Sequence, residues 1–170
     1  MSWKHWCWYV LFGLLMLGVL AEKISRAEWT LRHGAEYKCR VEGFDPPDFL
    51  RGRYVRFRVP DFPRHPADND WTKGKTCWYV PLTAGPDGMV EFGEPSAEMP
   101  PVGDHLKLRR ARYYVLSAPF SEFYVNEHRA QAVEAALRRH GSGILTFRVW
   151  QGFAVPVELS IGGLSVKEIR

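Results

Sequence analysis

The chain has 170 residues, of which 46% are hydrophobic and 25% are charged, a size and balance typical of one compact domain with an apolar core. Its formal net charge is only +4, too small to indicate a nucleic-acid-binding protein from bulk charge. The composition requires no second domain, and we do not expect nucleic acid as a partner.

An uncharged apolar segment near the N-terminus indicates where the protein works. It runs from Trp6 to Ala21, with Lys4 before it and Glu22 and Lys23 after it. Positive charge ahead of such a segment favours a cytoplasmic N-terminus and an exported remainder. As a helix the segment would span about 24 Å, less than the ~30 Å hydrocarbon core of a bilayer.

Two interpretations of this segment remain open. The small residues of Val19-Leu20-Ala21 suit a signal peptidase, and cleavage after Ala21 would release a soluble periplasmic protein. Interfacial aromatic residues instead favour a retained single-pass helix, and they gather at the cytoplasmic end as Trp3, Trp6, Trp8 and Tyr9. We therefore expect a membrane anchor or signal segment over residues 1–21 and one extracytoplasmic domain over residues 22–170.

Alternation with a period of two predicts strands through most of this domain. Val55, Phe57 and Val59 fall on one face of a segment that Pro60 ends. The same alternation is seen in Trp78, Val80 and Leu82, before a turn at residues 86–88 and a short strand at 89–92. Residues 106–116 are another strand candidate.

The C-terminal part predicts a hairpin. Residues 145–150 and 153–161 are two apolar strands around Gln151-Gly152. Five apolar residues of the second strand are expected on one face: Phe153, Val155, Val157, Leu159 and Ile161. Pro156 cannot donate a hydrogen bond and indicates an edge strand or a bulge.

One segment has helical periodicity instead. Asn126 suits an N-cap, Val133 and Leu137 share an apolar stripe with Ala130, and Gly141 follows the end. This pattern predicts a helix over about residues 126–140. The expected fold is mostly β, an antiparallel sheet or partly closed barrel with one packed helix, preceded by an N-terminal membrane helix.

The segment from residue 45 to 59 resembles the signature of the GDYXXLXY family of bacterial proteins. The matching residues are Asp45, Pro46, Asp48, Leu50, Arg51, Gly52 and Tyr54. The departures are Arg53 in place of Asp, Phe57 in place of Leu and Val59 in place of the last Tyr. Residues 123–127, with Tyr124 and Glu127, are similar to a second family segment, and residues 147–163 to its closing hairpin.

This resemblance implies an N-terminal membrane segment and a small domain with no established reaction. Family members are often encoded beside multi-span membrane proteins, which implies a membrane partner. The predicted function is a membrane-anchored binding or accessory domain in the periplasm or extracytoplasmic space of a bacterial cytoplasmic membrane. No cofactor is implied.

Paired carboxylates are the only candidates for catalysis. Asp45, Asp48 and Glu127 lie in the family-like segments, and two of them facing one cleft could act as general acid and base of a glycan-active envelope enzyme. The alternative is that Asp45 and Asp48 cap a turn and Glu127 favours a helix N-terminus. The six histidines have no metal-ligand spacing, so no metal is expected.

Basic residues are candidates for contacts with a partner or with lipid headgroups. One group comprises Arg51, Arg53, Arg56 and Arg58, and a second comprises Lys107, Arg109, Arg110 and Arg112. If the two segments paired as neighbouring strands, they would concentrate positive charge on one surface. The alternative is a solvated strand face that discourages aggregation.

Two cysteines belong to the expected domain. Cys39 and Cys77 lie in strand-like segments, so a disulfide would form if those strands pair in an oxidising compartment. Two buried free thiols are the alternative, because free cysteine packs as a small hydrophobic residue.

Overall fold

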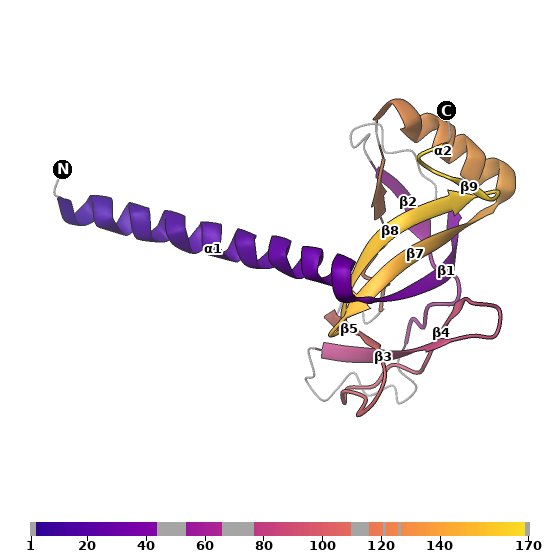
Figure 1. The fold of residues 1–170 in the computed structure, drawn as a ribbon, viewed down its shortest axis with the longest axis horizontal. Helices are drawn as coiled ribbons and strands as arrows, with labels where there is room; N and C mark the ends of the chain where they lie inside the picture. Colours follow the sequence, from indigo (N-terminus) through magenta and orange to yellow (C-terminus); the bar gives the residue numbers. More distant parts are fainter. Residues whose placement is uncertain are drawn as a thin grey trace.

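The computed structural model describes residues 3–43, 54–65, 77–109, 116–120, 122–125 and 127–168. The first element is α1 (Trp3–His33), a single helix that projects from the domain (Figure 1). It continues well past the predicted boundary at Ala21 because the following residues are mostly helix formers, and Arg32 and His33 complement the negative end of the helix dipole. The chain then enters β1 (Ala35–Gly43) directly.

The larger sheet is antiparallel and has the strand order β6-β2-β1-β7-β8-β9. Its other strands are β2 (Tyr54–Arg58), β6 (Glu122–Tyr124), β7 (Ser142–Trp150), β8 (Phe153–Ile161) and β9 (Leu164–Ser165). The predicted hairpin around Gln151-Gly152 is confirmed as β7 and β8.

The smaller sheet is antiparallel with the order β4-β3-β5. Its strands are β3 (Cys77–Ala84), β4 (Val90–Phe92) and β5 (His105–Arg109). One bridge joins β5 to the turn between β7 and β8, where the Lys107 amide donates to the Gly152 carbonyl at 2.8 Å. The mostly antiparallel β fold is thus confirmed, with its strands divided between two sheets.

The apolar core lies where the inner faces of these sheets meet. Phe147, Leu145 and Leu159 of the larger sheet are fully buried, as are Val80 and Leu106 of the smaller one. The predicted alternation is confirmed for five residues: Phe57, Val59, Trp78, Val80 and Leu82 are all buried. The side chain of Val55 lies outside the described part of the chain.

The expectation that β8 keeps one apolar face throughout is wrong. Phe147 is opposite Pro156 and Thr146 is opposite Glu158, so Val157 is an extra residue in β8, a bulge. The bulge confirms the prediction of an edge strand or bulge at Pro156. It also shifts the alternation of inward-facing and outward-facing residues by one position. Leu159 and Ile161 face the core, whereas before the bulge Ala154 does so and the neighbouring Phe153 lies on the outer face.

Helix α2 (Glu127–His140) confirms the predicted helix to within one residue. Val133 is fully buried and Leu137 is 3% exposed, because the apolar stripe packs on β1, β2, β7 and β8. Figure 1 places α2 on the side of the domain away from the projecting end of α1. The proposed N-cap, Asn126, lies outside the described residues.

Candidate functional site: the junction of the apolar helix and the sheet

The apolar part of α1 extends into the surroundings of the domain. Its large side chains, among them Leu11, Phe12, Leu14, Leu15, Leu17 and Leu20, are 55–63% exposed. Over Trp8–His33 the helix is long and apolar enough to cross a membrane, and none of its apolar window is buried. Such a surface is costly in water, at roughly 25 cal/mol per Å² of apolar area.

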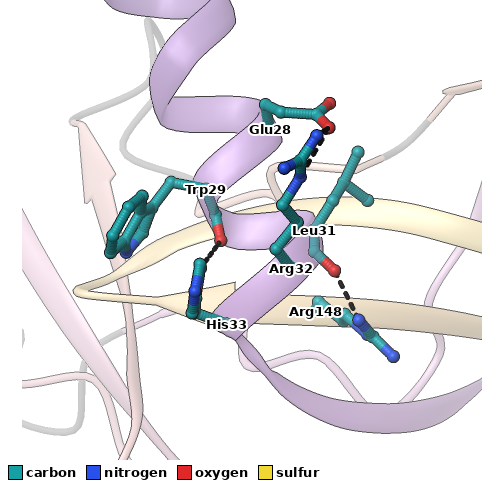
Figure 2. A network of polar contacts seen from close by, with 6 residues as sticks. All are labelled: Glu28, Trp29, Leu31, Arg32, His33 and Arg148. Atoms are coloured by element: carbon teal, nitrogen blue, oxygen red, sulfur yellow. Dashed lines mark hydrogen bonds and ion pairs between the residues drawn. The ribbon is translucent and has the colours of Figure 1, made fainter.

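Arg148 of β7 joins the end of α1 to the larger sheet (Figure 2). Its Nη1 donates to the carbonyl oxygen of Leu31, and its Nη2 lies 3.1 Å from Oε2 of Glu36 on β1. Glu36 and Arg148 are direct cross-strand partners. The guanidinium thus caps one of the free carbonyls at the helix end and binds the strand that follows it.

Thr30 and Gly34 allow the helix to approach the hairpin closely. Thr30 is fully buried and its hydroxyl donates to the Arg26 carbonyl at 2.9 Å. The Gly34 amide donates to the Thr30 carbonyl at 2.9 Å, which closes the last turn. A Cβ on Gly34 would lie 2.9 Å from the Val149 carbonyl oxygen, so only glycine fits this position.

Aromatic contacts complete the junction. We define the junction by seven residues: Arg26, Thr30, Leu31, Gly34, Glu36, Arg148 and Phe153. The Arg26 guanidinium lies 5.0 Å from the centroid of the Phe153 ring, within cation–π range. On the flank of the helix the rings of Trp29 and His33 stack at 4.1 Å (Figure 2). Glu28 and Arg32 form an exposed ion pair at 2.7 Å.

A partly buried hydrogen bond extends the connection to the smaller sheet. The Tyr37 hydroxyl, three residues past the junction glycine, donates to Oδ2 of Asp104 at 2.8 Å. Burial and this carboxylate together raise the pKa of Tyr37 to about 12. The Asp104 carbonyl in turn accepts from the Leu82 amide at 2.9 Å. Contacts therefore continue from α1 through β1 to β3.

Replacing Arg148 should measure the strength of the junction. Arg148→Ala removes a charged hydrogen bond to a helix carbonyl, which should lower the free energy of unfolding by about 1.5–3 kcal/mol. Arg58→Ala is a matched control, because Arg58 holds Glu42 at 2.9 Å on the same sheet without a helix carbonyl. Its expected cost is ~0–1 kcal/mol. Urea unfolding of the full chain in detergent distinguishes the two; equal losses would contradict the capping role.

Most of the family-like residues fall outside the described part of the chain: Asp45, Pro46, Asp48, Arg51 and Gly52. Of the others, Phe57 is 3% exposed and belongs to the core, and Tyr124 is 74% exposed. Tyr54 and Tyr124 are direct partners in the β2–β6 pair. The two family-like segments, far apart in sequence, therefore lie side by side.

The roles proposed for the candidate carboxylates remain predictions. Asp45 and Asp48 lie outside the described residues, and Glu127 begins α2 with a side chain that is not described. Within the described ranges, no group of three or more His, Cys, Asp or Glu side chains is arranged to hold a metal ion.

The described strands of the two basic segments, β2 and β5, are not neighbours. β2 lies between β6 and β1, whereas β5 pairs with β3 in the other sheet. Arg58 is engaged by Glu42. Arg53 and Arg112 lie outside the described residues, as do the side chains of Arg56 and Arg109. Within the described residues, β2 and β5 therefore do not pair with each other.

Cys39 and Cys77 are both free thiols, and their strands β1 and β3 lie in different sheets. Burial, with a smaller contribution from Asp61, raises the pKa of Cys39 to about 12.

In a Cys7→Ser variant at pH 8, iodoacetamide should therefore label Cys77 and leave Cys39 protonated and unmodified, and both should react after unfolding. Intact mass gives the count. A protein that takes up no label and whose mass is lower by two hydrogens would instead contain a Cys39–Cys77 disulfide.

The junction was not predicted from the sequence. Glu36 and Arg148 become partners only once the β1–β7 register is known. One local signal was present: Gly34 follows two basic residues at the end of a helix-forming stretch, a pattern typical of a helix C-terminus.

The fold and the junction define a small antiparallel β domain carried on a helix long and apolar enough to cross a membrane. The model of the family described as GDYXXLXY protein matches residues 16–159, most of the chain, so the protein belongs to this family. The match begins inside α1 and includes the whole junction. No curated protein and no solved structure matches the chain.

Proposed function

We propose that α1 is a retained single-pass span that holds the β domain on the extracytoplasmic side of a bacterial cytoplasmic membrane. The supporting observation is that α1 is one continuous helix, exposed along its apolar part and fixed to the sheet at Arg148. Lys4 and the aromatic residues before the apolar run favour a cytoplasmic N-terminus.

In this account the domain is a binding or accessory module of a multi-span membrane protein. The large apolar side chains from Trp8 to Leu20 are exposed and none of the apolar window is buried in the described part of the domain, so lipid and the helices of another protein are what surround them. Arg148 fixes α1 to the larger sheet, and the hydrogen bond from Tyr37 of β1 to Asp104 continues the connection toward the smaller sheet, which couples the domain to the span. Binding by the domain and packing of the span would then be linked.

Photo-crosslinking in native membranes tests this proposal. A photoreactive amino acid at Leu14 or Leu17 reports on the span, and one at Leu164, 56% exposed on β9, serves as a control far from α1. The proposal expects the same multi-span protein to be captured from both span positions after detergent extraction. Retained protein with no captured partner would contradict the accessory role and favour a surface binder or a glycan-active enzyme. Release of the domain from the membrane would favour a soluble periplasmic binder.

A further inference from the structure

The turn of the β7–β8 hairpin, Trp150–Phe153, lies next to α1. We infer that this hairpin turn is a second membrane contact, which rests on the phospholipid headgroups around the span. The inference depends on the proposed role of α1 as a span and adds a surface of the domain that touches the bilayer.

The end of the span places the hairpin turn at the membrane surface. The uncharged run of α1 ends at Ala21, so Glu22 and Lys23 are the first residues at the edge of the hydrocarbon core. Arg26 follows Ala21 by five residues, about 7 Å along the helix axis, which places it in the headgroup layer. Because the Arg26 guanidinium lies 5.0 Å from the Phe153 ring, the turn is within one arginine side chain of this depth. The headgroup layer on each side is itself roughly 5–7 Å thick.

Aromatic side chains suited to this layer are exposed there. Trp150 is 38% exposed and is the direct partner of Phe153 across the turn. Trp29, on the flank of α1, is 53% exposed. Tryptophan is enriched at membrane–water interfaces because its ring is apolar while its N–H remains hydrated. The aromatic residues thus lie on the part of the domain that is closest to the span.

Positive charge accompanies these rings. Lys107 is exposed beside the turn, its backbone joined to Gly152, and Arg26 is on the helix. The junction carboxylate Glu36 is already bound by Arg148, and Glu28 is bound by Arg32. Of the charged residues next to the span, Lys23 and Arg26 outnumber Glu22. The surface therefore complements anionic phospholipid headgroups.

A depth measurement on the full chain in vesicles tests the inference. A bimane label is placed at Gln151→Cys in a Cys7→Ser, Cys77→Ser background, which keeps only the buried Cys39. The matched control is Leu164→Cys, beyond the other end of β8 and about 26 Å away along the strand. Vesicles of phosphatidylcholine and phosphatidylglycerol carry a nitroxide on the headgroup, which quenches labels at its own depth.

The inference expects several-fold stronger quenching at position 151 than at position 164. The double variant Arg26→Gln, Lys107→Gln should reduce this difference in vesicles that contain phosphatidylglycerol and leave it unchanged in pure phosphatidylcholine. Equal quenching at the two positions, in protein that resists carbonate extraction, would contradict the hairpin contact while leaving the span intact. Protein that carbonate releases from the vesicles would contradict the span and the hairpin contact together.

Discussion

Gly34→Ala should destabilise the domain strongly, with a fall in melting temperature on the order of 10 °C, which corresponds to about 3 kcal/mol. The added Cβ would lie 2.5 Å from the Thr30 carbonyl oxygen and 2.9 Å from that of Val149. Both are backbone atoms, so neither can rotate away. Relief requires the helix to move off the hairpin, which would also break the contact of Arg148 with Leu31.

Gly43→Ala is the matched control for this experiment. Gly43 ends the same strand that Gly34 precedes, but a Cβ there would lie 3.6 Å from the Leu137 Cβ, an ordinary contact. Thermal unfolding of the full chain in detergent, followed by circular dichroism, should show a small change for Gly43→Ala. Equal melting temperatures for the two variants would mean that α1 is not tightly packed on β7.

Gly152→Ala should have the second large effect, because it acts where the two sheets meet. Gly152 has φ +79, and an added Cβ would lie 2.8 Å from the Lys107 Cβ and 3.2 Å from His105 Nε2. The unfavourable backbone angle and the clash together should cost about 2–4 kcal/mol. The 2.8 Å bond from the Lys107 amide to Gly152 would be weakened as well.

Gly88→Ala separates the two contributions to this cost. Gly88 has a similar backbone angle, φ +75, but has nothing within 4 Å of an added Cβ. Gly88→Ala should therefore lower the free energy of unfolding only by the ~1–2 kcal/mol that the backbone angle costs. Hydrogen exchange gives the local readout: Gly152→Ala should raise exchange at Leu106 and Leu108 in β5, and Gly88→Ala should not. Unchanged protection of β5 in Gly152→Ala would contradict the account of the sheet contact.

The sequence predicted what local periodicity determines. Trp78, Val80 and Leu82 are buried as their spacing indicates, and α2 begins one residue after the expected cap. Local patterns did not predict the features that depend on the register between distant strands. The bulge at Val157 moves Phe153 to the outer face, where it meets Arg26, and this depends on how β8 pairs with β7. No short-range signal contains that pairing.

The same limit explains the candidate site. Whether the two basic segments pair as neighbouring strands could not be decided from local patterns, because strand order is a property of the whole chain. Hydropathy changes at Ala21, but the helix that carries the apolar run continues to His33. In the junction Arg148 binds both Leu31 and Glu36, and each of them is more than a hundred positions away in the sequence. Only the fold brings them together.

The intact mass of the mature protein from carbonate-washed bacterial membranes tests the central claim, that α1 is a retained membrane span. The account predicts a membrane-bound protein whose mass includes the N-terminal segment up to Ala21, and whose domain is digested by protease added outside spheroplasts. A soluble protein with the mass of residues 22–170 would contradict it and identify the N-terminal segment as a cleaved signal peptide.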